Sequence, residues 1–201
     1  VYKGQVLFVL VWLADQFAKK ERIPYGIHPK QLGELFRSDA KAEGDKIVLG
    51  GWELRGSEDP RVARWYSIRL GRDELPWAYL RGDPFRAIAS LELLSTLLCL
   101  MVFGPSSDVL ANGSIALTAS GDNQSNGFTL EKFGTTKFPL FLVLMEVAEQ
   151  LRKRQIALSV VWRPREGNAE ADALTNEAFE AFAPHLRVPV VWDELDWVIL
   201  P

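Results

Sequence analysis

Four acidic side chains stand where they could act together on one bound group. Asp39 and Asp122 each follow a predicted strand, which is where sites form in α/β sheets. Glu92 lies within a long apolar run, and Asp172 opens a run of helix-forming residues. Carboxylates cannot crowd together without a counter-charge, and hard divalent cations that prefer oxygen ligands supply it. The pattern therefore predicts a divalent metal site, and one with few protein ligands suits Mg²⁺.

Each of these acids also has an ordinary structural interpretation. Asp172 is a first-turn anion that the helix dipole favours. The Gly-Asp-Asn sequence at 121–123 is typical of a turn. Glu92 either faces solvent or has a specific partner, and the second is favoured because its helix is apolar nearly all round. The sequence leaves these alternatives open.

Hydrophobic periodicity predicts the elements that must position the acids. Strands are expected at 35–39, 47–54, 61–70, 114–120 and 156–164, and helices at 4–20, 85–103, 124–133, 140–154 and 168–182. The Gly50–Gly51 pair within the second strand indicates a bulge or a close backbone approach. Asn168 stands at the N-cap position of the last helix.

Composition bounds the molecule to one domain with extensions. The chain has 201 residues, a net charge of −3 and 48% hydrophobic residues, enough for a substantial core. We expect an N-terminal helix and linker at 1–33, the main domain at 34–182 and a tail at 183–201. Trp192 and Trp197 in the tail predict docking on the body or on a partner.

Other features exclude several classes of protein. A single cysteine, Cys99, rules out an internal disulfide framework and is expected to be a buried apolar side chain. With two histidines and one cysteine, the donor set argues against zinc. The apolar opening run stops at Asp15, short of the ~20 residues that span a bilayer. We therefore expect no membrane partner and an intracellular location.

Four stretches resemble the ribonuclease H-like family, and more narrowly the ribonuclease H domains attached to retroelement reverse transcriptases. The resemblance covers about residues 34–182, and the last stretch is the most specific. It is carried by RSDAKAEGDKIVLGGWEL, PFRAIASLELLSTLLCLMVF, IALTASGDNQSNGFTL and VVWRPREGNAEADALTN. It implies an α/β fold with a five-stranded mixed sheet, three antiparallel strands and then two parallel ones, flanked by helices.

The resemblance also implies an activity and a site. Asp39, Glu92, Asp122 and Asp172 match the family's four metal-binding acids, which hold two Mg²⁺ or Mn²⁺ ions. The implied reaction is two-metal hydrolysis of the RNA strand of an RNA–DNA hybrid, with RNA selected through its 2′-hydroxyl. Candidates for contact with the nucleic-acid backbone are the polar side chains of the two loops, which also suit turns and caps: Asn123, Gln124, Arg165 and Asn168.

The chain also departs from the family pattern. Ala40 and Lys41 follow the first acid where many ribonucleases H have glycine and serine, and a lysine there could pair with a carboxylate. The loop RPREGN before Asp172 lacks the histidine that many active members have. Weak activity in isolation, with help from a covalently linked reverse transcriptase domain, is therefore expected. The alternatives are an inactive tether or binding module of a reverse transcriptase and a DNA-cutting nuclease or transposase of the same fold.

Overall fold

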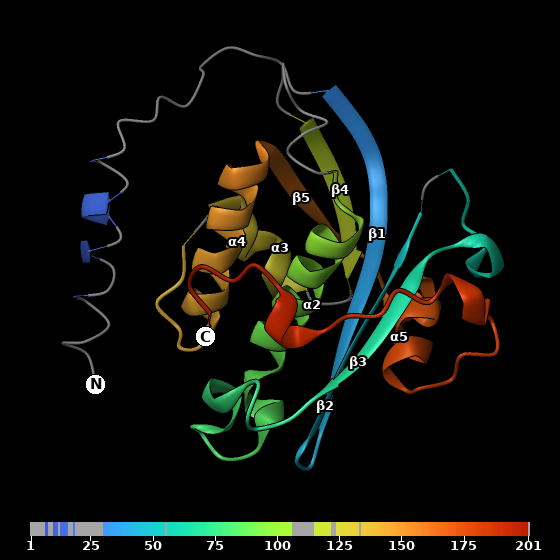
Figure 1. Cartoon of the computed structure of the whole chain (residues 1–201), viewed down its shortest axis with the longest axis horizontal. Coiled ribbons are helices and arrows are strands. Elements are labelled where there is room, and N and C mark those ends of the chain that lie inside the picture. Colours follow the sequence, from blue (N-terminus) through green and yellow to red (C-terminus); the bar gives the residue numbers. More distant parts are fainter. Residues whose placement is uncertain are drawn as a thin grey trace.

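A single mixed sheet of five strands forms the centre of the protein (Figure 1). The computed structural model describes residues 7, 10–11, 13–15, 18, 30–54, 56–105, 115–121, 124–132 and 134–200. The strand order is β3-β2-β1-β4-β5; β1, β2 and β3 pair antiparallel, and β4 is parallel to both β1 and β5. This is the predicted sheet. Its strands are β1 (Lys30–Glu43), β2 (Lys46–Glu53), β3 (Trp65–Leu70), β4 (Ile115–Gly121) and β5 (Ile156–Trp162).

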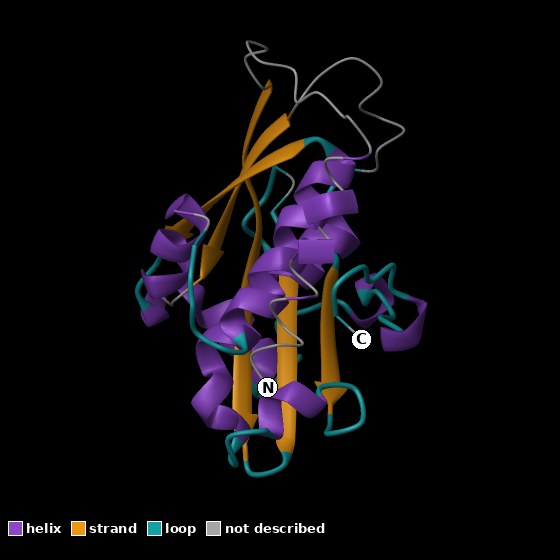
Figure 2. Ribbon diagram, turned by 90° about the vertical axis from the view of Figure 1, so that its left-hand side faces the viewer, coloured by secondary structure: helices purple, strands orange, loops and turns teal. Residues whose placement is uncertain are grey.

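Helices cover both faces of this sheet. On one face, α2 (Ile88–Phe103) packs on β1 and β2, and α4 (Leu140–Arg154) packs on α2 and β5. Figure 2 looks onto this face of the sheet. The helix α3 (Gln124–Lys132) lies against β5. On the other face, α5 (Ala169–Thr175) contacts β1, β2 and β3. Short 3₁₀ helices complete the chain at Pro60–Val62, Pro76–Tyr79, Pro84–Ala87, Arg165–Asn168, Pro184–Leu186 and Trp192–Glu194.

The core helix α2 is buried as its composition predicts. Its leucines are excluded from solvent, and Cys99 is a free, buried thiol. Among the described residues, 84–103 are also long and apolar enough to span a membrane, with a mean hydropathy of 1.8. Because 61% of that window is buried inside the protein, contacts with the sheet and α4 account for its apolar character.

The Gly50–Gly51 pair lets helices approach β2 closely from both faces. A Cβ added at Gly50 would lie 2.7 Å from the Cβ of Leu174 in α5. One added at Gly51 would lie 2.1 Å from the sulfur of Cys99 in α2. Both separations are far below van der Waals contact, so any larger side chain would push a helix away. The predicted close approach is confirmed.

The last helix is shorter than predicted. α5 ends at Thr175, whereas the pattern indicated helix to residue 182. Glu177 has a φ of 61° and breaks the helical path. The apolar residues beyond it are packed from irregular chain: Phe179 lies 5.0 Å and Phe182 5.5 Å from the Trp65 ring, centroid to centroid. Their contact with β3 explains why the apolar pattern continues where the helix does not.

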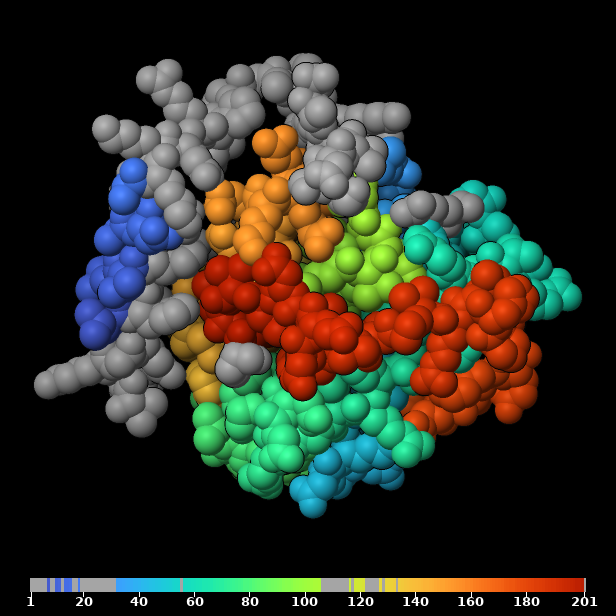
Figure 3. All heavy atoms as spheres, in the orientation of Figure 1, coloured from blue at the N-terminus to red at the C-terminus, as the bar shows by residue number. Residues whose placement is uncertain are grey.

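The C-terminal tail docks on the body of the protein (Figure 3). Trp192 is buried, and its ring lies 4.6 Å from that of Trp197. Glu146 of α4, fully buried, anchors the end of the tail. Its Oε2 accepts hydrogen bonds from three consecutive backbone amides, at 3.1, 2.6 and 3.0 Å for residues 198, 199 and 200. A buried carboxylate is costly without such donors.

The first prediction concerns the close approach at Gly51. Gly51→Ala should lower the free energy of unfolding by about 2 kcal/mol, because a methyl group cannot fit beside the Cys99 sulfur. Urea denaturation measures this. Cys99→Ala in the same chain should recover part of the loss. The control Gly134→Ala, where an added Cβ meets only the Lys132 carbonyl oxygen at 3.6 Å, should be near neutral. Wild-type stability of Gly51→Ala would refute the packing account.

The second prediction concerns the tail anchor. Glu146→Gln should destabilise the protein by about 3 kcal/mol, because an amide offers one acceptor oxygen and turns a donor toward the tail amides. Denaturation followed by tryptophan fluorescence reports both unfolding and release of the tail. The exposed tail variant Glu194→Gln is the control. Equal stability of both variants would contradict the anchoring role.

Candidate functional site

Asp39 is a buried carboxylate within β1, which continues to Glu43, whereas the predicted strand ended at Asp39. Its residue is 6% exposed and pairs with Gly50 across the antiparallel β1–β2 ladder. The Asp39 Oδ2 accepts a hydrogen bond of 2.6 Å from the hydroxyl of Thr175, the last residue of α5. Asp39 therefore faces α5, on the side of the sheet that Gly50 keeps open for that helix.

The parallel strand β4 ends beside Asp39. Its last described rung with β1 pairs Ser120 with Arg37, two residues before Asp39. Its last rung with β5 pairs Gly121 with Trp162. Asp39 thus stands just past the carboxyl end of β4, where α/β sheets leave room for ligands. The predicted residues Asp122 and Asn123 lie outside the described residues.

Glu92 approaches the same strand from the α2 face. It is half-buried, and Thr96 one turn later donates its hydroxyl hydrogen to the Glu92 carbonyl oxygen at 3.1 Å. The Thr96 and Ser38 hydroxyls are 3.0 Å apart. Because neighbouring strand residues point to opposite faces, Ser38 faces α2 while Asp39 faces α5. Glu92 and Asp39 are therefore carried by elements on opposite faces of β1.

Asp172 lies on α5, one turn before Thr175. Its side chain is 37% exposed, and its Oδ2 accepts a 2.8 Å hydrogen bond from Asn176. Arg165 Nε is 3.8 Å from its other oxygen. Lys41, the departure from the family pattern, donates to Asn176 Oδ1 at 3.1 Å and pairs with Glu43 at 3.0 Å. Asn176 therefore stands between Lys41 and Asp172.

The predicted substrate contacts differ in accessibility. Arg165 is 75% exposed in its side chain. Gln124 begins α3, and its side chain is outside the described part of the structure. Asn168 is buried and occupies the predicted N-cap position of α5, but its side chain makes no capping hydrogen bond. Its amide instead donates to the Ser38 carbonyl oxygen at 3.1 Å, and its Oδ1 has no partner within the described chain.

The described residues test whether a metal ion fits. Within the described ranges, no three acid, histidine or cysteine side chains form a group that could hold one. The available donors are hard oxygens: the carboxylates of Asp39, Glu92 and Asp172 and the unsatisfied Asn168 Oδ1. Such donors suit Mg²⁺ or Mn²⁺ and not softer ions. The types of these donors suit a divalent ion, but the described side chains do not gather into one group, and Asp122 lies outside the described residues.

Sequence patterns missed a charged network beside the site. Glu34 accepts hydrogen bonds from Arg37, Arg163 and Ser120. In a regular strand, residues 34 and 37 would point to opposite faces. The β1–β4 register shifts on both sides of Glu34, and Gly33 has a φ of 74°, so the strand bulges and brings the two side chains together. Gly33 was the only available sequence signal.

The hydrogen bonds of this network stabilise the negative charge of Glu34. Burial would raise the pKa of Glu34, but hydrogen bonds from Arg37, Ser120 and Arg163 outweigh it and lower that pKa below its ordinary value. Glu34 is therefore ionised at neutral pH. Burial raises the pKa of the Cys99 thiol well above its ordinary value, which makes it unsuited to act as a nucleophile.

The strand order and directions decide the fold. An antiparallel β1-β2-β3 meander is followed by parallel β4 and β5 on the other side of β1, with helices on both faces. The fold is ribonuclease H-like. No protein-family model and no curated protein sequence matches the chain.

Several solved structures are similar to this ribonuclease H-like chain. A ribonuclease H1 from Halobacterium salinarum is 19% identical with a TM-score of 0.46, over 75% of this chain and 98% of that one. LC11-RNase H1 from compost, in complex with an RNA/DNA hybrid, is 22% identical with a TM-score of 0.49, over 71% and 94%. The protease-reverse transcriptase of prototype foamy virus is 16% identical with a TM-score of 0.43, over 79% of this chain and 22% of that one.

The third prediction is a pH dependence at the end of α5. Ion pairs with Arg69 and Lys46 lower the pKa of Glu177 from 4.5 to about 2. Because the pKa of Glu177 is lower in the folded state than in the unfolded state, its ion pairs stabilise the protein at pH values above 4.5. This stabilisation is lost as the pH falls from 4.5 toward 2. Glu177→Gln should therefore be less stable than wild type at pH 7, and the gap should narrow at pH 3. Urea midpoints at both pH values measure it; a gap that widens in acid would contradict the ion pairs.

Proposed function

We propose that this chain is a metal-dependent endonuclease that hydrolyses the RNA strand of RNA–DNA hybrids. The observation that carries the proposal is the place of Asp39, a buried carboxylate past the end of β4 with an acid-bearing helix on either side. A buried carboxylate is costly unless it is paired, hydrogen-bonded or bound to a metal ion. The motifs around Asp39, Glu92 and Asp172 also resemble those of the ribonuclease H-like family.

Each residue of the site has a defined part in this proposal. Asp39, Glu92, Asp122 and Asp172 would hold two Mg²⁺ or Mn²⁺ ions. When bound, such ions lower the pKa of an attacking water and stabilise the leaving 3′-oxygen. Thr175 orients Asp39 through the 2.6 Å hydrogen bond.

The proposed substrate is bound by its backbone. The net charge of −3 does not favour a broad electrostatic grip on nucleic acid, so individual cations near the site matter more. Arg165 is exposed and close to Asp172, where a phosphate could replace its weak contact with the carboxylate. Asn123 and Gln124 follow β4 in the sequence and are proposed to contact the same strand of the nucleic acid. Recognition of RNA would depend on its 2′-hydroxyl groups.

A covalently linked reverse transcriptase domain is the proposed partner. The motif resemblance supports it, and so do exposed apolar side chains in the N-terminal helical residues: Leu7, Leu10 and Val11 are 62%, 56% and 59% exposed. An apolar face of this kind favours contact with another protein surface. The chain would then be one part of a retroelement polyprotein.

A non-catalytic tether is the second candidate, and one observation favours it. The Asp172 carboxylate is already engaged by Asn176 and lies 3.8 Å from Arg165. Both contacts compete with a metal ion. In this alternative the domain would bind or space a polymerase without cutting.

The fourth prediction separates these functions. With Mg²⁺ or Mn²⁺, the wild-type chain should cut the RNA strand of a labelled hybrid and leave matched duplex DNA intact. Asp39→Asn, which keeps the shape and removes the charge, should lower the rate by about a thousandfold or more because one ligand is lost. Denaturing gels of both substrates show the result.

Controls make each outcome decisive. Asp193→Asn changes an exposed aspartate of the tail and should cut at the wild-type rate. Cleavage of duplex DNA at an equal rate would support the DNA-cutting alternative of the same fold. If the chain binds the hybrid but does not cleave it at any metal concentration, the result would support the non-catalytic tether and refute the nuclease proposal.

A further inference from the structure

One carboxylate joins three segments of the sheet next to the candidate site. Glu34 of β1 accepts from Arg37 of the same strand at 3.1 and 3.3 Å. It accepts from Arg163, the residue after β5, at 3.2 and 2.8 Å, and from Ser120 of β4 at 2.5 Å. Glu34, Arg37, Ser120 and Arg163 are called the Glu34 brace below.

The brace closes on the end of β4. Ser120 and Arg37 form the last described rung between β4 and β1. The backbone amide of Arg163 donates to the Gly121 carbonyl oxygen at 3.0 Å, while its side chain holds Glu34 and contacts the Ser120 hydroxyl at 3.1 Å. The two residues that precede Asp122 are thus held by both backbone and side chain.

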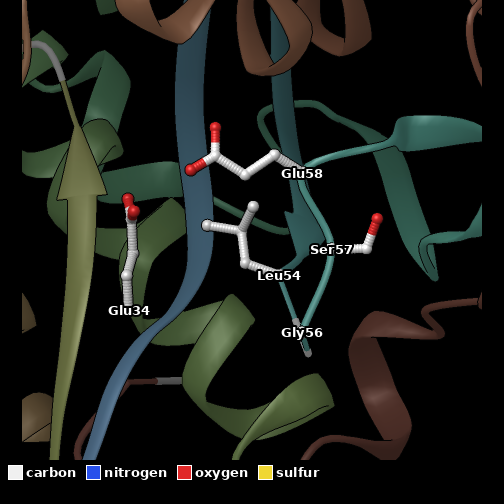
Figure 4. A pocket seen from close by; sticks show the side chains of 5 residues that line it. All are labelled: Glu34, Leu54, Gly56, Ser57 and Glu58. Carbon is white, nitrogen blue, oxygen red and sulfur yellow. The ribbon is translucent and has the colours of Figure 1, made fainter.

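The two arginines are committed to carboxylates and do not form an anion site. Arg37 is 5% exposed in its side chain and makes a second ion pair of 3.2 Å with Glu58. Glu34 and Glu58 both line the neighbouring pocket of about 260 Å³, with Leu54, Gly56 and Ser57 (Figure 4). Arg37 is already paired with both carboxylates at the edge of this pocket, so its guanidinium is not available to bind phosphate there. The brace therefore acts on the protein itself.

We propose that the Glu34 brace positions the end of β4 for metal binding. The inference rests on the proposed function, and it assigns Glu34 and Arg163 as positioning residues that do not touch metal or substrate. Ends of strands fray more readily than their centres, whereas metal ligands must be held within about 0.5 Å. A junction of two ion pairs and a hydrogen bond at Ser120, two residues before the proposed ligand Asp122, meets that requirement.

The first test needs no metal. In the metal-free protein, amide hydrogen exchange of Arg163 reports its hydrogen bond to Gly121. Glu34→Gln should speed this exchange by about tenfold, because the end of β4 opens locally once the junction is broken. The control Glu53→Gln breaks the ion pair between the buried Glu53, the last residue of β2, and Arg64, the residue before β3. It should leave the exchange of Arg163 unchanged after correction for global stability.

The second test measures Mn²⁺ affinity by titration calorimetry. Glu34→Gln should weaken binding by about tenfold, as for residues that orient metal ligands, while Glu53→Gln should bind as wild type. Arg163→Lys keeps the charge and loses the two-point contact with Glu34. If the position of the guanidinium matters, Arg163→Lys should bind Mn²⁺ as weakly as Arg163→Met does. Wild-type affinity in Arg163→Lys would show a charge effect and overturn the brace.

Failure of the two proposals can be told apart. Absence of both Mn²⁺ binding and cleavage in the wild type would refute the proposed function and, with it, the brace. Wild-type binding and cleavage with normal Mn²⁺ affinity in Glu34→Gln would refute the brace alone. If Glu34→Gln fails to fold, Arg163→Lys carries the same comparison, because Glu34 keeps its bond to Arg37.

Discussion

The rest of the structure depends on the two-sided contact at Gly50–Gly51. A helix approaches from each face at a separation that only glycine allows. Ser95 of α2 donates to the Gly50 carbonyl oxygen at 3.0 Å, and Ser67 of β3 donates to the Leu174 carbonyl oxygen of α5 at 2.9 Å. Steric fit and hydrogen bonds thus fix both helices against β2, and hence the acids that they carry.

This contact explains why the candidate site lies where it does. Asp39 is the direct partner of Gly50, so the place of closest helix approach is also the place of the buried carboxylate. α5 contributes Thr175 and Asp172 from one face, and α2 contributes Glu92 from the other. β4 ends beside Asp39, and Ser120 near that end is part of the Glu34 brace. Packing on one strand and ion pairing on its neighbour are thus complementary constraints.

Much of this architecture could be predicted from the sequence, because periodicity reports burial. α2 is apolar nearly all round, α4 has apolar residues at helical spacing, and Gly104 and Pro139 bound them, so their predicted limits agree with the structure to within a few residues. The helix after residue 168 was overpredicted because Phe179 and Phe182 continue the apolar pattern while packing on Trp65 from irregular chain.

The network around Glu34 could not be predicted, because it depends on a break in strand periodicity. Regular alternation would separate Glu34 from Arg37, and only the bulge places them on one side. Similarly, Asn168 has the type and position of an N-cap, but tertiary contact with Ser38 overrides the local preference. Asp39, Glu92 and Asp172 are predicted from motif position, which proposes candidate ligands but does not show the bonds that orient them.

The most direct measurement of the central claim is a calorimetric titration of Mn²⁺ into the chain without nucleic acid, in wild type and in Asp39→Asn. The account predicts saturable binding to the wild type and affinity lower by about a hundredfold or more in the variant, since one charged ligand is removed. Binding that is absent from the wild type, or equal in the two proteins, would contradict a metal site built around Asp39.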